Sequence, residues 1–239
     1  MFYYLLSAAL SFDVVLVTAA VVPAIILMVK VYQSDHLEKE SSQMLWNLVK
    51  AGIMSALLAL VEERVFSSLL QLAVPYNSPW YPIILYFGVV AISEESSKYI
   101  MMRGRTWKSL EFNCQYDGVV YAVFVSLGFA LWENISYVLH YGFGTALIRA
   151  ITAIPGHASF GVFMGVFYGL AKKLENAGEH DKSVLFRVLS IVVPAALHGA
   201  YDYIASTEGG SWSFVIFILV LFAVSYWTVG KSSKADRPI

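Results

Sequence analysis

Two adjacent carboxylates and a lysine interrupt a stretch of sequence that is otherwise apolar between Trp80 and Met102. On a helix, Glu94 and Lys98 are four residues apart, so they share a face and can form an ion pair. Glu95 points about a third of a turn away and is left without that partner. Burying a lone charge in lipid costs roughly 2.5–3.5 kcal/mol or more. These charges therefore mark either a helix end, an interhelical salt bridge or a polar site inside an apolar environment.

Two further acidic residues and two histidines lie within later apolar stretches: Glu133, His157, His198 and Asp202. Asp202 follows His198 by four residues, so its carboxylate can orient the imidazole and stabilise its charge. Phe129 precedes Glu133 by one helical turn and can screen that carboxylate from lipid. A single buried histidine is usually a hydrogen-bonded core residue. The whole group, together with the Glu94–Glu95 pair, favours a functional polar site.

These residue types point to an activated water, because no serine or cysteine is placed as a credible nucleophile. Either Glu94 or Glu95 deprotonates the water directly, or a metal ion activates it. In the metal alternative Glu133, His157 and His198 supply one oxygen and two nitrogens, which with water form the ligand set of many zinc enzymes. The H-E-x-x-H motif is absent from the sequence, so zinc is allowed but not required.

Three polar residues have supporting roles in this hypothesis. Asn134, or one of the histidines, can stabilise an oxyanion. Arg149 lies near the start of the segment that carries His157. Lys98 is a candidate counter-charge for the glutamates, with a divalent cation as the alternative.

The composition is that of a membrane protein. Of 239 residues, 58% are hydrophobic and 14% are charged, against roughly 45–50% and 25% in soluble domains. The apolar residues form blocks of about 20, the length that crosses a bilayer. A net charge of −1 and the lack of a long basic run argue against a nucleic-acid partner. Cys114 is the only cysteine, which excludes an intrachain disulfide and favours a reduced, structural thiol.

The apolar blocks predict an all-α, polytopic transmembrane bundle of about seven helices, with no soluble domain. The expected helices cover about 2–31, 45–74, 81–102, 116–140, 145–171, 185–205 and 212–229. The second contains Glu62, Glu63 and Arg64, which mark either a break in the helix or a charged cluster facing the bundle interior. The fifth contains four glycines that allow close approach of another helix: Gly156, Gly161, Gly165 and Gly169. In the first, Asp13 is expected at the interface and Pro23 at a kink.

Lysine and arginine alternate between the predicted loops. The segments 75–82, 140–145 and 206–211 contain neither residue, whereas the intervening loops and the C-terminal tail are basic. The positive-inside rule then predicts an outside N-terminus, a cytoplasmic C-terminus and a multi-pass protein of the cell membrane. With this topology Glu94, Glu133, His157 and His198 all lie roughly 10–18 Å below the outer surface, at 1.5 Å per residue.

Four groups of residues resemble motifs of the PrsW family of intramembrane proteases. They are S-E-E-S-S-K at 93–98, Y-D-G-V-V-Y with S-L-G-F-A-L-W-E-N within 116–134, R-A with G-H-A-S-F-G-V-F-M-G within 149–165, and V-P-A-A-L-H-G-A-Y-D at 193–202. The resemblance covers about 93–229. It implies an endopeptidase that makes the first cut in a membrane-anchored anti-sigma factor, on the extracytoplasmic side. The expected partners are thus such a single-pass substrate and the lipid bilayer.

The resemblance also implies a division of the chain and a more distant relationship. Residues 1–75 form N-terminal transmembrane helices, 76–230 a PrsW-like protease core, and 231–239 a cytoplasmic tail. The PrsW family is distantly similar to the CAAX prenyl proteases, which implies a CAAX-protease-like core. Against the CAAX motifs, Glu133 replaces a histidine, and Asp202 replaces the asparagine that follows His198 by four residues.

Two other classes of function remain compatible with these residues. A proton- or cation-coupled transporter also uses glutamates and histidines inside the membrane. The matched, interrupted helices in inverted halves that many transporters show are missing from the sequence. An inactive relative that binds a single-pass membrane protein is the other alternative.

Overall fold

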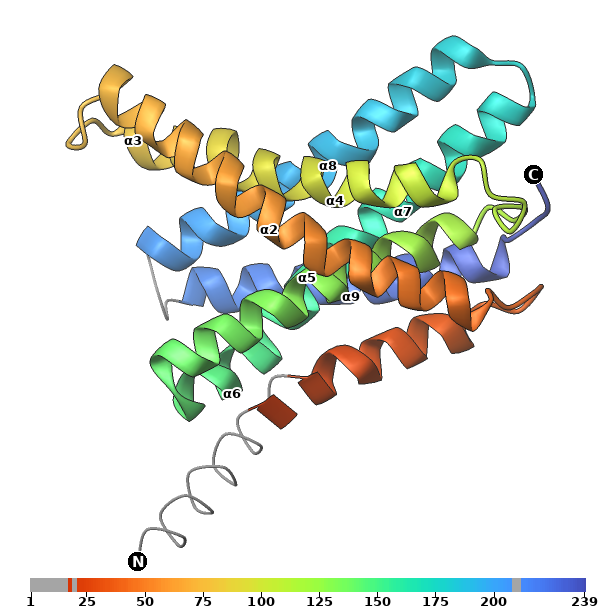
Figure 1. Cartoon of the computed structure of the whole chain (residues 1–239), viewed down its shortest axis with the longest axis horizontal. Coiled ribbons are helices and arrows are strands. Elements are labelled where there is room, and N and C mark those ends of the chain that lie inside the picture. The colour runs from red at the N-terminus through yellow and green to blue at the C-terminus, as the bar shows by residue number, and fades with distance from the viewer. Residues whose placement is uncertain (1–16, 19–20, 208–211) are drawn as a thin grey trace, which may run out of the picture.

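The computed structural model describes residues 17–18, 21–207 and 212–239, and these form a bundle of helices joined mostly by short loops (Figure 1). The helices are Val21–Gln33, α2 (Ser42–Ala73), α3 (Trp80–Ile83), η1 (Ile84–Val90), α4 (Ala91–Thr106), α5 (Asp117–Tyr141), α6 (Phe143–Ile151), α7 (Ala153–Asn176), α8 (His180–Thr207) and α9 (Trp212–Lys234). No strand occurs among the described residues, where the only β-type pairing is an isolated bridge between Cys114 and Pro238.

The predicted all-α, polytopic bundle is confirmed. The elements α3, η1 and α4 follow one another directly and form the third predicted helix, and α6 with α7 occupies the fifth. Among the described residues, five helical segments are long and apolar enough to cross a membrane: Ser42–Ala73, Asp117–Tyr141, Phe143–Asn176 (α6 with α7), His180–Ser206 and Trp212–Lys234. Of the first predicted helix, Asp13 lies outside the described residues, and Pro23 lies within the helical segment Val21–Gln33.

The prediction of one uninterrupted fifth helix is wrong. Thr152 separates α6 from α7 with φ −119° and ψ −67°. Pro155 explains the position of the break, because it has no amide N–H to donate to the carbonyl of Ile151, four residues earlier. Gly142, with φ +80°, joins α5 to α6 in a conformation that glycine adopts readily. The short helix α6 is therefore an independent element.

The proposed break at Glu62 is also wrong, because α2 runs continuously for 32 residues. Its first turn is capped by Ser41, whose hydroxyl accepts a hydrogen bond from the amide of Met44 at 3.1 Å. The alternative, a charged cluster facing the interior, agrees with the structure for Glu62 and Glu63, whereas Arg64 is exposed. Glu62 accepts a hydrogen bond from the hydroxyl of Ser97 at 3.1 Å, and Glu63 lines a pocket together with Glu94 and Glu133.

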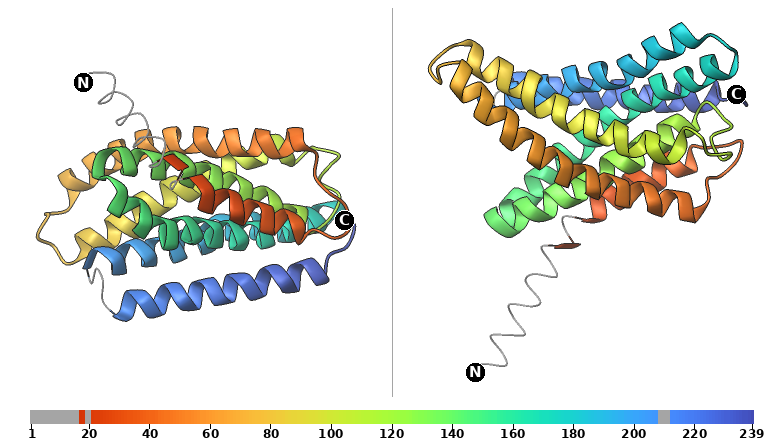
Figure 2. Two further views of the ribbon diagram at one scale, coloured as in Figure 1. Left: turned by 90° about the horizontal axis from the view of Figure 1, so that it is seen from below. Right: turned by 45° about the horizontal axis from the view of Figure 1, so that its top comes forward.

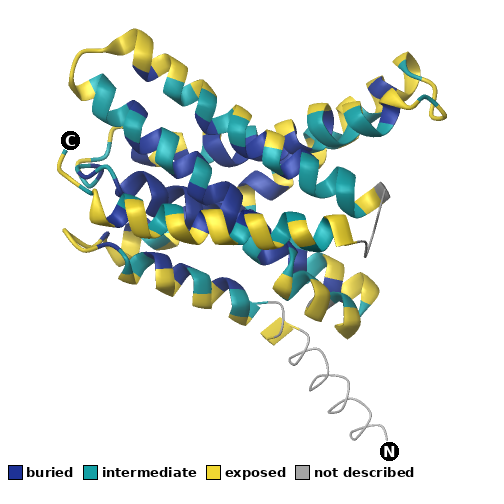
Figure 3. Cartoon of the chain, turned by 180° about the vertical axis from the view of Figure 1, so that it is seen from behind, coloured by how far each residue is buried: buried dark blue, intermediate teal, exposed yellow. Residues whose placement is uncertain are grey.

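The centre of the bundle is α5, which packs against α2 on one side and α7 on another. Its buried residues form the core that Figure 3 shows in dark blue. Glycines allow both contacts. A methyl group added to Gly165 of α7 would lie 2.4 Å from the carbonyl oxygen of Gly118 on α5, and one added to Gly128 would lie 2.4 Å from that of Val49 on α2. The expected close approach at the glycines of the fifth helix is thus confirmed for Gly165.

The loops gather at two ends of the bundle (Figures 1 and 2). The α2–α3 loop and the α5–α6 junction lie at one end. The α4–α5 loop, the α7–α8 loop and the C-terminus lie at the other, and each of these segments contains or adjoins lysine or arginine. The tail packs on the α4–α5 loop through bonds from the amide of Tyr116 to Asp236 and from that of Ile239 to Asn113, both 2.8 Å. The expected division into three parts stays a prediction, as does the side of the membrane that each end faces.

Candidate active site

A pocket of about 360 Å³ opens among α2, η1, α4, α5, α6, α7 and α8. Its lining residues are Ala56, Leu60, Glu63, Tyr86, Val90, Glu94, Phe129, Trp132, Glu133, Ser136, Tyr137, Arg149, Ala153, His157, Phe160, His198, Tyr201 and Asp202. On α5 and α8 the lining residues lie in the C-terminal half of the helix, and on α2 they extend from the middle toward the C-terminal end. On the third predicted helix the lining residues of η1 come before Glu94 of α4. In each case the lining residues extend toward the end of the bundle that carries the α2–α3 loop.

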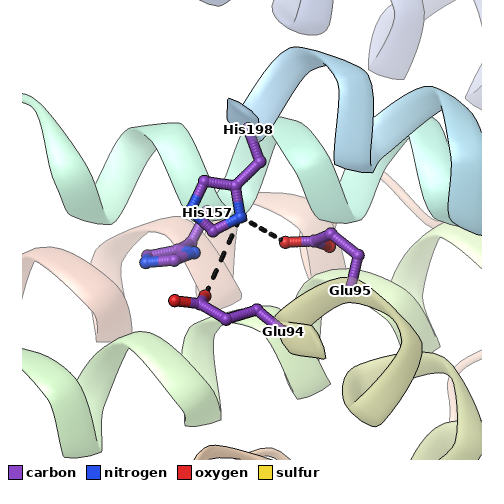
Figure 4. Close-up of side chains that lie close together, drawn as sticks. All are labelled: Glu94, Glu95, His157 and His198. Atoms are coloured by element: carbon purple, nitrogen blue, oxygen red, sulfur yellow. Dashed lines mark hydrogen bonds and ion pairs between the residues drawn. The ribbon is translucent and has the colours of Figure 1, made fainter. Parts of the chain in front are cut away.

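Four donor side chains lie close together (Figure 4), and three of them, Glu94, His157 and His198, line this pocket. Glu94 and Glu95 come from α4, His157 from α7 and His198 from α8, and all four are buried. One ligand-type atom of each lies within 4.8 Å of those of the others. The helix reaches Glu94 directly after the π-helical turns of η1, a local geometry that is frequent at functional sites.

Lys98 lies among these donors. Its ammonium Nζ is 2.7 Å from Oε1 of Glu95, 3.2 Å from Oε2 of Glu94 and 3.2 Å from Nδ1 of His157. The expectation that Glu95 lacks this partner is wrong, because the lysine stem reaches three residues back as well as four. Glu95 and Lys98 are both fully buried. The two charges of the glutamate pair are therefore partly neutralised within α4 itself.

Each histidine is held at its Nε2 atom by a carboxylate. Nε2 of His157 lies 2.8 Å from Oε2 of Glu133, and Nε2 of His198 lies 3.4 Å from Oδ2 of Asp202. Nδ1 of His198 lies 2.9 Å from Glu95, so the Nδ1 atoms of both rings face the glutamate pair and Lys98. The predicted pairing of Asp202 with His198 agrees with this geometry. Outer carboxylates of this kind fix the ring orientation in metal-binding histidines.

Glu133 is fixed by a neighbour that α6 supplies. Nη2 of Arg149 donates to Oε2 of Glu133 at 2.8 Å, and Nε of Arg149 donates to Oδ1 of Asn134 at 3.0 Å. Asn134 is buried and is not among the pocket-lining residues, so its oxyanion role finds no support in this position. Phe129 does lie at the site, with its ring 4.0 Å from the Lys98 ammonium. The ring thus covers the ammonium, in a cation–π contact, as well as lining the pocket beside Glu133.

The donor set suits a divalent metal ion of the zinc type. Two carboxylates and two imidazoles are ligands that zinc accepts, and their compact arrangement needs no long-range movement of the helices. The set differs from the predicted one, because Glu94 and Glu95 stand beside the histidines and Glu133 lies behind His157. Each of the predicted residues lines this pocket or contacts a side chain that lines it, and Asn134 does so through Arg149.

Glu63 is the acidic pocket residue to which the sequence assigned no role in the site. It lines the pocket from α2, opposite the motif residues of the other helices. The sequence indicates a role for this residue through the charged triplet Glu62, Glu63 and Arg64, which interrupts an apolar block. Charges in such a block cost free energy unless they face a polar site.

Known proteins resemble this chain over most of its length. A family model described as "PrsW family intramembrane metalloprotease" matches residues 40–229, which extends the expected resemblance to include α2. The protein named Protease PrsW of Halalkalibacterium halodurans is 35% identical over 227 residues, covering 93% of this chain and 99% of that protein. Protease PrsW of Bacillus subtilis is 30% identical over 223 residues, covering 92% and 95%. No solved structure matches the chain.

These matches favour a peptidase over the transporter alternative, while the distant similarity to CAAX prenyl proteases stays a prediction. They agree with the buried group of glutamates and histidines and with the membrane-spanning helices. The chain therefore belongs to the PrsW family of intramembrane metalloproteases and is a peptidase of the cell membrane that crosses the bilayer several times.

Proposed function

We propose that this protein hydrolyses a peptide bond of a membrane-anchored substrate with a water molecule activated at the Glu94–Glu95–His157–His198 group. The observation that supports this most strongly is the buried cluster that these four side chains from three helices form, with three of them lining the pocket. In lipid such a concentration of charge is expensive unless it has a use. A carboxylate in reach of water is a general base, and imidazoles beside it can donate to an oxyanion.

The two glutamates differ in access, which suggests different roles. Glu94 lines the pocket, whereas Glu95 does not line it and is fully buried between Lys98 and His198. We assign Glu94 as the residue that contacts the water and accepts its proton. Glu95 is then a positioning residue, which holds the ammonium and the imidazole in place.

If a metal ion is present, Glu94, Glu95, His157 and His198 would hold it, and zinc is the ion that suits them. The ion would supply Lewis acidity to the water and to the scissile carbonyl. The outer carboxylates Glu133 and Asp202 would keep both imidazoles in the required tautomer, with the proton on Nε2 and the lone pair on Nδ1.

The substrate class is a single-pass membrane protein that enters from the predicted extracytoplasmic side. The pocket walls extend toward the end of the bundle whose loops lack lysine and arginine, which the positive-inside rule places outside. An anti-sigma factor, cut near its outer membrane boundary, fits this requirement. Residues 76–230 would then supply most of the site, with Glu63 of α2 completing one wall.

The test is cleavage of a co-reconstituted single-pass substrate by Glu94→Gln and Glu95→Gln variants. The amide keeps the shape of the side chain and removes the base. We expect Glu94→Gln to lose at least about 10²-fold in rate, the lower range for a general base. Glu179→Gln, in the exposed α7–α8 loop, is the control and should cleave like the unchanged protein.

The proposal is wrong if folded Glu94→Gln and Glu95→Gln proteins both cleave at the unchanged rate. Elution as a monodisperse species and an unaltered thermal transition would show that each variant is folded.

A further inference from the structure

The ammonium group of Lys98 occupies the place of a cation in the donor cluster. Three of the four donors touch it: Glu94 at 3.2 Å, Glu95 at 2.7 Å and Nδ1 of His157 at 3.2 Å. The fourth donor, His198, bonds to the same oxygen of Glu95 that Lys98 contacts. The lysine side chain is fully buried, so this position is set by the protein and not by solvent.

The bond between Lys98 and His157 uses the lone pair of this ring that a metal ion would need. Nδ1 of His157 has one lone pair in the plane of its ring, and in this structure that lone pair accepts from the ammonium. Nε2 of the same ring is directed to Glu133, so it offers no alternative ligand atom toward the cluster. A metal ion ligated by His157 and both glutamates therefore cannot coexist with Lys98 in this position.

Charge leads to the same conclusion. An ammonium and a divalent cation at the centre of one cluster would repel each other strongly in a buried site. The Lys98 ammonium lies 4.0 Å from the centre of the Phe129 ring, and this cation–π contact stabilises the lysine in the observed position.

We propose that Lys98 is an internal counter-ion that competes with a divalent metal ion for the Glu94–Glu95–His157 donors and thereby lowers the metal affinity of the site. The inference rests on the proposed function only in taking this cluster as the place where a metal binds. Two states follow for the site. In one, the lysine neutralises the glutamates. In the other, a metal ion does so and the ammonium has left the donors.

The experiment measures Co²⁺ binding to the purified full chain in detergent, because Co²⁺ occupies zinc-type sites and absorbs visible light. Lys98→Met removes the charge and keeps most of the side-chain length. We expect Lys98→Met to bind one Co²⁺ per chain at least about tenfold more tightly than the unchanged protein, because the competing charge is gone. The double variant Lys98→Met with His198→Ala should lose this gain.

Lys172→Met is the matched control. Lys172 donates to the carbonyl of Trp107, near the opposite end of α7 from the cluster, and its loss should leave Co²⁺ affinity unchanged. Equal or weaker Co²⁺ binding by Lys98→Met than by the unchanged protein overturns the proposal. Absence of Co²⁺ binding in both proteins overturns it as well.

Stability supplies a second measurement, because Lys98→Met leaves two buried glutamates without their counter-ion. If that variant folds poorly, Co²⁺ in the purification buffers should restore it, and should raise its thermal transition more than that of the unchanged protein. A variant that stays unfolded with Co²⁺ contradicts the proposal. Cleavage is not used as a readout, so a failure of the proposed peptidase mechanism would leave these binding results interpretable.

Discussion

At the scale of single residues, the site depends on carboxylates that bind the far side of each imidazole. Asp202 lies 3.4 Å from Nε2 of His198, and Glu133 lies 2.8 Å from Nε2 of His157. These contacts direct the Nδ1 atoms toward the glutamate pair. A change in either outer carboxylate should therefore alter the chemistry without removing any group that touches the water.

Asp202→Asn tests this arrangement. The amide preserves the size of the side chain but can turn its NH₂ toward His198 and so favour the wrong tautomer. We expect the cleavage rate to fall about 10- to 100-fold, the usual cost of losing an outer partner of a functional histidine. Single-turnover cleavage of a reconstituted substrate measures the effect. An unchanged rate would show that Asp202 does not orient His198 during catalysis.

The types and spacing of residues predicted most of this group, including the i, i+4 relation between His198 and Asp202. They did not predict that Lys98 prefers Glu95, because helical spacing permits both pairings and only the fixed side-chain conformations decide. The position of Glu63 in the pocket could not be predicted either, because spacing along the sequence does not show how α2 packs against the other helices.

At the scale of the elements, crossings at glycine set the distances between the helices that carry the site. In α7, Gly165 lies against Gly118 and Val119 of α5, eight residues beyond His157. Glycine at position 165 lets the two backbones touch, whereas any larger residue there would push α7 away from α5. Such a movement would carry His157 away from the glutamates of α4.

Gly165→Ala is the corresponding prediction. Its added methyl group would lie 2.4 Å from the carbonyl oxygen of Gly118, so the helices must separate. We expect a loss of about 1–3 kcal/mol of stability, the usual cost of overpacking, together with a lower cleavage rate. Gly230→Ala in α9 is the control, because nothing lies within 4 Å of its added methyl group. Equal thermal transitions for the two variants would contradict this account of the crossing.

The loop before α2 carries a buried acid outside the membrane-spanning helices. Burial, and then the nearby carboxylate of Asp117, raise the pKa of Glu40 from 4.5 to about 9. The folded protein therefore keeps this proton over a pH range in which the unfolded chain releases it. The free energy of unfolding should fall as pH rises from about 4.5 toward 9, by at most about 1.4 kcal/mol per pH unit for one group.

Glu40→Gln removes this dependence. At about pH 5 the variant and the unchanged protein should have similar thermal transitions, and by about pH 8 the variant should be the more stable. Thermal unfolding in detergent across this range measures the difference. A difference that stays constant with pH would show that Glu40 does not hold its proton in the folded protein.

The elements themselves were largely predictable, since blocks of about 20 apolar residues have few alternatives to a membrane-spanning helix. The break at Thr152 was not predicted, because Pro155 acts on a carbonyl four residues earlier while the apolar sequence continues across the break. The π-helical turns of η1 have no signature in an apolar run such as I-L-Y-F-G-V-V.

At the scale of the whole molecule, the lining residues of the pocket extend toward one end of the helix bundle. The inner part of the pocket holds Glu94, His157 and His198, and its walls lead to the end of the bundle whose loops lack lysine and arginine. The depth predicted from helix positions placed Glu94, Glu133, His157 and His198 in one layer, and the structure brings these residues together. The account therefore predicts where in its own membrane segment a substrate is cut.

Mass spectrometry of the cleavage products shows where the substrate is cut, and so whether the Glu94 pocket cuts it from the outer side. The purified protein is co-reconstituted with a single-pass substrate of known orientation, and both product ends are sequenced. The account predicts one main cut in the outer part of the substrate's membrane segment, absent with Glu94→Gln. A cut in the cytoplasmic half, or the same cut made by folded Glu94→Gln protein, would contradict it.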